Sequence, residues 1–595
     1  MNIRETGAED VHWDLTHLYA DESELRNDLS EIMGGSEKFN QSWRGKIASL
    51  SATQLKQAIM EYEQLQERAG RAMTYVYLSW ATATHHAERG ALLQHVRELY
   101  TQIGKNLLFF GLEWLKVESA HAQRLMEEEE LAGYRHFLEC ERLLKEYTLS
   151  EPEEKVLAEA QVTGRSAWTR YFTEIISRMR FTLRGEELSQ EHVLAKLHAH
   201  DRDLRREAAE SFTHGLVTKE HTLTYIFNTF LADKASIDRM RGFPHWLKSR
   251  NLNNEIADET AEALIQSVVE RYDLVVRFYE LKSKILGVSP LYDYDRYAPV
   301  GESDSYYSWS DARRIVLESY GGFHPLLAEI AERFFEEKWI DAPVQEGKQG
   351  GAFSHGAVPS VHPYVLLNYT GRARDVQTLA HELGHGVHQF LSRGRGYLQA
   401  STPLTTAETA SVFGEMLTFQ RLLSAESNSR NKLALLIGKI DDTMATVFRQ
   451  VTMNRFEDAI HTARRTQGEL SSDIFAEHWI STQSAMYGSS VTLTDQYRHW
   501  WSYIPHFLHT PGYVYAYAFG ELLVLALHMR YQQSPDEFPD RYIELMRAGG
   551  SDWPHILVAR LGVDLQDPEF WQQGLSAIEA LIERAEERYA YENPM

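Results

Sequence analysis

The 595-residue sequence predicts a mainly α-helical protein. Proline-free stretches with apolar residues at helical spacing follow one another along most of the chain, and only one stretch, between residues 346 and 369, has the composition of strands. A hydrophobic content of 43% is enough for a large core and for more than one domain. We therefore expect helices packed on helices, with one short pair of strands.

The first third of the chain reads as successive amphipathic helices. Between residues 51 and 117 the helical pattern is free of proline, and Leu55 and Ile59 fall on one helical face. A further helix is expected to start after Ser150, because this serine is followed by proline in the first turn and by Glu153 three residues later. Helices are then expected to continue to about residue 340.

Charge and cysteine content exclude several classes of partner and site. The chain has 61 Lys and Arg and 85 Asp and Glu, so its net charge is −24, and without a basic block it is not suited to bind nucleic acid or an anionic membrane surface. Cys140 is the only cysteine, which excludes an intrachain disulfide and a cysteine-rich zinc module. Neither a signal-peptide pattern nor a run of about 18 apolar residues is present, and we expect a cytoplasmic protein without membrane contact.

Residues 375–391, DVQTLAHELGHGVHQFL, carry the strongest chemical signal. Asp375 is a good N-cap and an apolar stripe follows it, so we expect a helix. His381 and His385 then lie one above the other and can bind one metal ion, while Glu382 lies about 100° round the helix, within reach of a water molecule on the metal. Such a string arises by chance in roughly one in ten chains of this composition, so a third ligand is needed.

Gly384 and Gly386 are unusual inside this helix. Each glycine costs roughly 1 kcal/mol of helix stability relative to alanine. We therefore expect a packing or access reason for them, such as the close approach of another backbone.

Two downstream glutamates are candidates for the third ligand. In residues 401–423, Thr405 or Thr406 can cap a helix that carries Glu408 and Glu415 seven residues apart, and so on one face. One carboxylate can complete a zinc site of two histidines, one carboxylate and water. The other can accept a hydrogen bond from a ligand histidine. The residue pattern alone does not decide between the two glutamates.

The glycine-rich sequence EGKQGGAFSHG gives way to YVLLNY at residues 364–369, which predicts a strand pair just before the metal-site helix. An extended peptide can pair with the free edge of such a strand, so that its main chain is aligned whatever its sequence. We assign Gly351, Ala352, Phe353 and His355 to substrate binding. A plain structural hairpin is the alternative.

The last stretch with candidate catalytic residues is 500–523. His506 is followed by the turn Pro511-Gly512 and then by Tyr513 and Tyr517, one helical turn apart. Phenol and imidazole groups near a metal can donate hydrogen bonds to the oxyanion of a tetrahedral intermediate. An aromatic core patch is the alternative.

Together these segments resemble the oligoendopeptidase F branch of the thimet oligopeptidase family of zinc metallopeptidases. The matching segments, in chain order, are WDLTHLY at 13–19, GGAFSHG at 350–356, PYVLLNY at 363–369, HELGH at 381–385, AETASVFGE at 407–415, TVFRQVTMNRFE at 446–457 and IPHFLHTPGYVYAYAFG at 504–520. Because these segments are linked in the right order over nearly the full chain, they are far more specific than HELGH alone.

The resemblance implies a role for each residue of the metal site. His381, His385 and Glu408 are expected to bind one Zn²⁺ per chain. Glu382 is expected to be the general base. Glu415 is expected to contact a ligand histidine without binding the metal itself.

On the oxyanion side, Tyr513 matches the family tyrosine that stabilises the intermediate. His506 and Tyr517 match at a longer spacing than in thimet-type relatives. Where those relatives have a further tyrosine, this chain has Phe519 and Gly520. This departure leaves the number of oxyanion donors open.

The resemblance also implies a fold and a reaction. We expect two helical lobes around a deep substrate channel, with residues 1–195 as an N-terminal helical domain and residues 196–595 as the catalytic domain. The expected activity is zinc-dependent hydrolysis of internal bonds in short, unstructured oligopeptides. One alternative is a carboxypeptidase or dipeptidyl carboxypeptidase on the same zinc machinery, although no anchor for a substrate C-terminus is recognisable. The other is a helical peptide-binding protein whose site has decayed.

Overall fold

Helix dominates the computed structural model, which describes residues 5–301 and 306–592. Helices account for 71% of the structure and strands for 3%, which confirms the predicted mainly α-helical fold. The described residues form two units: the first lies within Met1–Lys145, Asp304–Ala425 and Arg530–Asp564, and the second within Glu146–Ser303, Glu426–Met529 and Leu565–Met595. The domain boundary at residue 195 and the two lobes with their channel stay predictions.

The first unit is built from helices of the N-terminal, central and C-terminal parts of the chain. Its helices are α1 (Glu22–Trp43), α2 (Ala52–Ala81), α3 (Ala87–Leu107), α4 (Phe109–Lys116), α5 (Ser119–Glu127), α6 (Arg135–Cys140), α14 (Trp309–Phe323), α15 (Pro325–Glu336), α16 (Ala373–Ser392), α17 (Leu404–Ala407), α18 (Thr409–Ala425), α24 (Phe538–Ala548) and α25 (Pro554–Ala559).

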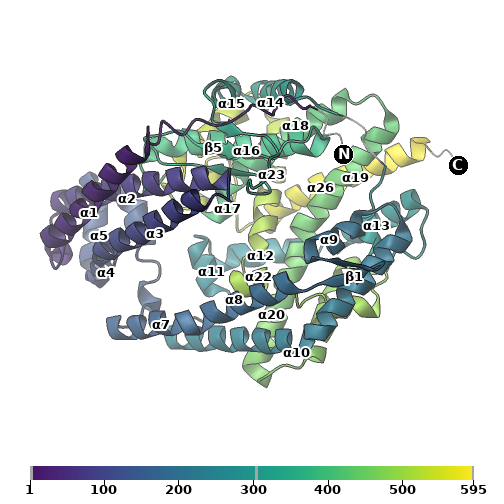
Figure 1. The fold of residues 1–595 in the computed structure, drawn as a ribbon, viewed down its shortest axis with the longest axis horizontal. Coiled ribbons are helices and arrows are strands. Elements are labelled where there is room, and N and C mark those ends of the chain that lie inside the picture. The colour runs from purple at the N-terminus through teal and green to yellow at the C-terminus, as the bar shows by residue number, and fades with distance from the viewer. Residues whose placement is uncertain (1–4, 302–305, 593–595) are drawn as a thin grey trace. The chain divides into compact units, whose positions relative to one another are not determined.

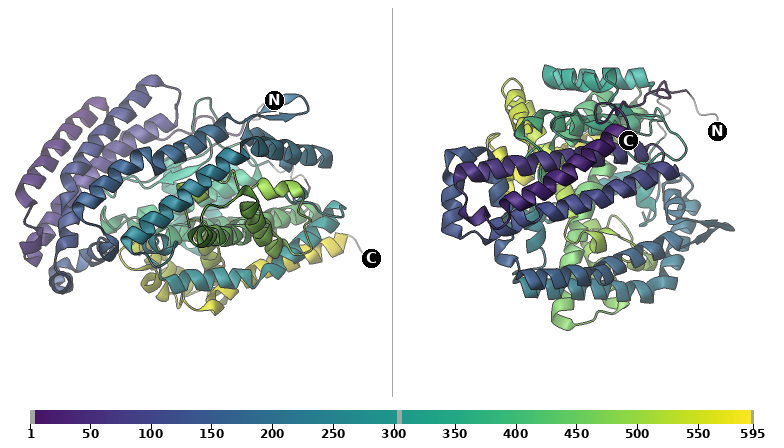
Figure 2. Two further views of the ribbon diagram at one scale, coloured as in Figure 1. Left: turned by 90° about the horizontal axis from the view of Figure 1, so that it is seen from below. Right: turned by 60° about the vertical axis from the view of Figure 1, so that its left-hand side comes forward.

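Helices α1, α2 and α3 lie side by side (Figure 2). α2 begins after Ser51, which forms a capping box with Gln54. Leu55 and Ile59 are fully buried, as the apolar periodicity predicts. Burial of each such side chain contributes about 1.5 to 3 kcal/mol, so the apolar faces hold these helices together.

A three-stranded sheet lies next to α16 in this unit, with the strand order β3-β5-β4 (Figure 1). β4 (Phe353–His355) runs antiparallel to β5 (Tyr364–Leu366), and β3 (Ile340–Asp341) runs parallel to β5 on its other side. The strand pair predicted before the metal-site helix is thereby confirmed. β4 is an edge strand of this sheet.

The second unit is almost entirely helical. Its helices are α7 (Glu151–Thr163), α8 (Arg165–Arg178), α9 (Gln190–Ala195), α10 (Arg202–Arg241), α11 (Lys248–Asn253), α12 (Asp258–Val269), α13 (Tyr272–Leu286), α19 (Ser429–Thr443), α20 (Arg449–Gln467), α21 (Ser472–Tyr487), α22 (His506–His509), most of α23 (Tyr515–Gln533), and α26 (Pro568–Glu592). α7 starts where predicted, with the Glu153 carboxylate accepting from the Ser150 N–H at 2.9 Å.

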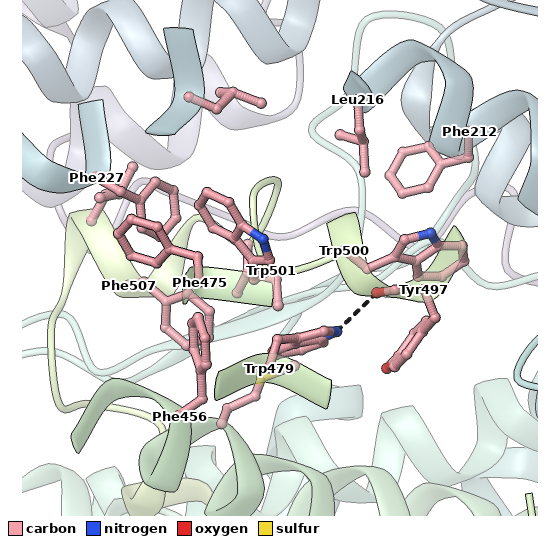
Figure 3. Packing of buried hydrophobic residues seen from close by; sticks show 14 of the residues in the cluster. Phe212, Leu216, Phe227, Phe456, Phe475, Trp479, Tyr497, Trp500, Trp501 and Phe507 are labelled. Carbon is pink, nitrogen blue, oxygen red and sulfur yellow. Dashed lines mark hydrogen bonds between the residues drawn. The ribbon is translucent and has the colours of Figure 1, made fainter. Parts of the chain in front are cut away.

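Aromatic side chains fill the core of the second unit (Figure 3). Phe227 of α10 meets Trp501 edge to face at 4.9 Å between ring centroids. Phe456 of α20 and Phe507 of α22 lie 5.3 Å apart. Large rings in such arrangements contribute about 0.5 to 1.5 kcal/mol per pair beyond their buried area, so they fix α20 and α22 within this unit.

A β-hairpin in the second unit was not predicted. β1 (Phe181–Leu183) pairs with β2 (Glu186–Leu188) through a two-residue turn. Arg184 and Gly185 in that turn have φ of 51° and 87°, as tight hairpin turns require. Strands of three residues are too short to show periodicity, and the Arg-Gly pair was the only local signal.

Among the described residues, no helix combines the length and the apolar character needed to cross a membrane.

Candidate active site

Helix α16 begins earlier than predicted. Its first residue is Ala373 and its N-cap is Arg372, so the prediction of Asp375 as N-cap is wrong. Asp375 lies in the first turn, and its carboxylate accepts from the N–H groups of Thr370 at 2.9 Å and Arg372 at 3.1 Å. A carboxylate in the first turn satisfies the same unpaired donors as an N-cap does, so the sequence signal was real but its register was misread.

His381 and His385 lie on one face of α16. Their ring centroids are 5.0 Å apart, and Nε2 of each ring lies 3.4 Å from Oε2 of Glu408. Ligand atoms of the three residues all lie within 4.8 Å of one another, which is close enough to hold a metal ion. The structure thus brings together the two histidines and one of the two candidate glutamates.

Glu408 lies at a break between two helices, not inside one continuous helix as predicted. α17 ends at Ala407 and α18 starts at Thr409. α17 begins after Pro403, so neither Thr405 nor Thr406 is an N-cap. The break turns the Glu408 carboxylate toward α16, and continuous helical spacing did not reveal it.

Glu415 approaches the same site from the other side of His381. Its Oε2 lies 3.3 Å from Nδ1 of His381, whereas Glu408 faces Nε2. A carboxylate that accepts from Nδ1 leaves the Nε2 lone pair directed at a metal. The two glutamates, which the residue pattern leaves undecided, therefore occupy different positions.

The electrostatics of this group favour a positive charge. Burial lowers the pKa of His381, but hydrogen bonds to Glu408 and Glu415 outweigh burial and raise it to about 10. The two histidines hold the pKa of Glu408 far below its usual range, although burial opposes them. A metal ion meets this preference for positive charge, and two imidazoles with one carboxylate are a donor set typical of catalytic zinc.

Glu382 lies beside this group and is only 8% exposed. The N–H of Ser354 in β4 donates a hydrogen bond to its carboxylate. Burial raises the pKa of Glu382, while His381 and His385 lower it. A buried carboxyl group with a raised pKa, held in place by a strand, is suited to act as a general base and then as a general acid.

The two glycines of the HELGH helix lie where neighbours approach closely, as predicted. A Cβ on Gly384 would lie 2.5 Å from the Ala410 carbonyl oxygen and 2.6 Å from the Ser411 Cα of α18. A Cβ on Gly386 would lie 2.6 Å from the Phe334 ring. Gly384 therefore lets the backbone of α18, and with it Glu408, come close to α16 (Figure 1).

Gly384→Ala is accordingly expected to lower stability by about 1 to 3 kcal/mol, because the added methyl group meets backbone atoms that cannot rotate away. The expected result is a lower thermal unfolding midpoint and weaker zinc binding. Gly438→Ala is the matched control, since a methyl group at this position of helix α19 would meet no described atom of a neighbouring element within 4 Å. An unchanged midpoint for Gly384→Ala would contradict the close helix packing.

Two of the residues assigned to substrate binding precede β4. Gly351 is exposed, has a φ of +80°, and its carbonyl accepts from the Asn368 side chain at 2.8 Å. Ala352 follows it and is partly buried. The Asn368 contact fixes the start of the edge strand.

The other two, Phe353 and His355, lie in β4 and project to the same side of the strand. Their rings lie 5.7 and 5.8 Å from the ring of Tyr77 in α2. Burial lowers the pKa of His355 to about 4, so that its imidazole is neutral at pH 7. The substrate role of these residues stays a prediction.

His506, Tyr513 and Tyr517 lie in the second unit, and the structure brings their side chains together there. The Tyr517 hydroxyl lies 3.3 Å from Nε2 of His506, and the rings of Tyr513 and Tyr517 are 5.0 Å apart and nearly perpendicular. Burial lowers the pKa of His506. Phe519, at the position where the resemblance implies a further tyrosine, packs against Trp571 with 4.9 Å between ring centroids and is fully buried.

Sequence reasoning missed several residues that hold the metal-site side chains. The Ser411 hydroxyl donates to Oε2 of Glu408 at 2.7 Å. The hydroxyl of Tyr320 in α14 donates to the Ala380 carbonyl, where the absence of a side chain on Gly414 leaves room for the phenol. Only Ser411, three residues after Glu408, had a sequence position that could have suggested its contact.

Comparisons with known proteins show which family the chain belongs to. The model of "Peptidase family M3" matches residues 195–577, and that of "Oligopeptidase F" matches residues 113–181. The chain is 26% identical to oligopeptidase PepF of Bacillus subtilis (strain 168), over 98% of this chain and 88% of the relative. It is also 26% identical to group B oligopeptidase PepB of Streptococcus agalactiae serotype III (strain NEM316), over 94% of each chain.

Solved structures show the same fold. The crystal structure of a Chlamydophila abortus protein matches with a TM-score of 0.87 and 24% identity, over 99% of this chain and 100% of the other. Oligoendopeptidase-F from Enterococcus faecium matches with a TM-score of 0.71 and 22% identity, over 95% and 98%. The family model covers well over half of the chain and contains the HELGH helix. This chain therefore belongs to peptidase family M3, in its oligoendopeptidase F branch, and is a peptidase.

Proposed function

We propose that this peptidase is a zinc-dependent endopeptidase that hydrolyses internal bonds of short, unstructured oligopeptides. The observation that carries the proposal is the convergence of His381, His385 and Glu408 within 4.8 Å of one another, with the buried Glu382 beside them. Two imidazoles, one carboxylate and an adjacent carboxylate base are what hydrolytic zinc sites require.

His381, His385 and Glu408 would hold the ion. Zn²⁺ bound there would act as a Lewis acid toward a peptide carbonyl and a water molecule. Glu415 accepts from Nδ1 of His381 and so keeps this ring oriented with Nε2 toward the ion. Ser411 holds the Glu408 carboxylate through the 2.7 Å hydrogen bond.

Glu382 is the proton carrier in this proposal. Its carboxylate takes a proton from the attacking water and gives it to the leaving amine. The raised pKa of Glu382 makes its carboxylate a stronger base than that of an exposed glutamate. The Ser354 N–H, which donates to Glu382, helps to hold the carboxylate in place.

Substrate alignment is assigned to the edge strand β4, with Gly351, Ala352, Phe353 and His355. A strand edge binds the main chain of an extended peptide without regard to its sequence. Ser354 belongs to this strand, so the aligned peptide and the proton carrier would share one rigid support.

Tyr513, with His506 and Tyr517, is assigned to the developing oxyanion. Loss of one such hydrogen-bond donor typically costs about 10²-fold to 10³-fold in turnover. The hydrogen-bond distance between Tyr517 and His506 supports treating the three side chains as one group.

Cut mapping tests the proposal. Zinc-loaded protein is incubated with peptides of graded length whose two ends are blocked, and every product is identified by mass spectrometry. We expect internal cuts in short peptides and none in folded proteins. Cleavage that requires a free C-terminus would point to a carboxypeptidase or dipeptidyl carboxypeptidase, and absence of any cleavage would point to a decayed site.

A further inference from the structure

The turn Pro511-Gly512, just before Tyr513, is held from one side by a buried glutamate. Oε1 of Glu457 in α20 accepts a hydrogen bond from the Gly512 N–H at 2.9 Å. Glu457 is 1% exposed, so water does not compete for this contact. The residue pattern alone suggests no role for Glu457, which is the last residue of the segment TVFRQVTMNRFE.

Residues 246–250, which lead into α11 and form its first turn, hold the turn from the other side. Gly512 has a φ of +72°, and a Cβ on it would lie 2.5 Å from Leu247 Cδ1 and 3.2 Å from Trp246 Cζ3. Nε of Arg250 donates to the Pro511 carbonyl at 3.3 Å. The turn therefore has a fixed backbone conformation with no space for a side chain.

α20 also fixes the segment on the far side of the turn. The Trp246 ring stacks on His461 with 4.5 Å between centroids and 11° between planes, and its Nε1 donates to Asp458 at 2.8 Å. One face of α20 thus contacts both the turn and Trp246, through Glu457, Asp458 and His461. Residues 250–253, whose composition predicts a turn, instead form most of α11, and Asn251 accepts from the Tyr515 hydroxyl at 2.8 Å.

A small cavity lies behind the turn, lined among others by Lys234, Glu457, His461 and Pro511. Oε2 of Glu457 has no hydrogen-bond partner among the described residues, and burial raises the pKa of this carboxyl group to about 8. Such a group costs stability, so packing alone would favour an apolar side chain here.

We propose that Glu457 is a positioning residue for Tyr513, because its carboxyl group holds the Gly512 N–H and so fixes the turn from which Tyr513 extends. The inference rests on the proposed role of Tyr513 at the oxyanion. It gives a functional reason for a buried carboxyl group that packing does not explain. Because the rings of Tyr513 and Tyr517 are in contact, a fixed Tyr513 also restricts the position of the Tyr517 ring.

The test compares Glu457→Leu with Glu457→Gln in the zinc-loaded full chain. Leucine fills a similar space but cannot accept the hydrogen bond, so we expect kcat to fall about 10-fold to 100-fold with KM nearly unchanged. Glutamine keeps an acceptor oxygen and is expected to restore most of the turnover that leucine loses. Glu469→Leu, at an exposed position just beyond α20, is the matched control and should behave like wild type.

A double-mutant cycle with Tyr513→Phe separates positioning from general stability. Without the Tyr513 hydroxyl, Glu457→Leu is expected to lower kcat by no more than about threefold. Equal losses in both backgrounds, or a glutamine variant as slow as the leucine variant, would overturn the inference while zinc-dependent cleavage stands. A wild-type kcat for Tyr513→Phe would overturn both the inference and the proposed oxyanion role. Thermal midpoints of all variants show whether a slow variant is folded.

Discussion

Replacing Glu382 with glutamine is expected to lower kcat for an internally cleaved peptide by about 10²-fold to 10⁴-fold, the range for loss of a general base. The amide has the same shape and can still accept from the Ser354 N–H, but it cannot take up a proton. Zinc content should stay at one ion per chain, because Glu382 is not among the three residues that converge on the ion position. Steady-state hydrolysis and metal analysis of the same preparation measure both quantities.

Glu329→Gln is the matched control for this substitution. Glu329 is exposed on α15, a helix that packs against α16, and it has no place in the proposed chemistry. Its variant should cleave at the wild-type rate. Wild-type turnover by Glu382→Gln would remove the general base from the mechanism.

Replacing His385 with alanine is expected to lower zinc affinity by more than about 100-fold and to abolish hydrolysis at ordinary zinc concentrations. The reason is that two of the three donors cannot hold the ion against water and competing chelators. Competition with a chromophoric chelator gives the affinity, and activity measured while zinc is returned gives the functional consequence. Hydrolysis that persists in the zinc-free variant would contradict the ligand assignment.

The same measurement separates Glu408 from Glu415. Glu408→Gln is expected to act like His385→Ala, since Glu408 faces Nε2 of both histidines. Glu415 contacts only Nδ1 of His381, and loss of such an outer hydrogen bond in Glu415→Gln typically costs about 10-fold to 100-fold in affinity. The reverse order of effects would exchange the roles of the two glutamates.

The metal-site helix could be predicted because its signals are local. Helical spacing placed His381 and His385 on one face, and two costly glycines indicated a close neighbour before that neighbour was known. The strand pair β4 and β5 could also be predicted, because glycine-rich and β-branched sequence lies close to that helix. In each case the determining residues are near one another in the chain.

Other features could not be predicted because distant contacts determine them. The break at Glu408 lies close to the point where α18 packs on α16 at Gly384, whereas helical spacing alone predicts a continuous helix. The hydrogen bond from Ser354 to Glu382 depends on where β4 meets α16. Glu408 and Glu415 are told apart by the nitrogen of His381 that each one faces, Nε2 or Nδ1. The spacing of the two glutamates along the chain does not reveal this difference.

The position of the N-cap of α16 was predicted wrongly for a local reason, because more than one residue near the helix start can satisfy its free N–H groups. The sequence predicts Asp375 as the N-cap, yet this residue caps the helix from the first turn by accepting from the Arg372 N–H. Both arrangements satisfy the exposed N–H groups of a helix start, so composition alone cannot fix the register. This uncertainty did not affect the histidine spacing on which the site depends.

The most direct test measures zinc content and internal cleavage together on one sample. The protein is stripped with a chelator, zinc is returned in steps, and cuts in an end-blocked peptide are counted at each step. We predict that cleavage is absent from the stripped protein, rises in proportion to bound zinc, and saturates at one ion per chain. Full internal cleavage by the stripped protein, or saturation with zinc without any internal cut, would contradict the assignment of a zinc endopeptidase site to His381, His385 and Glu408.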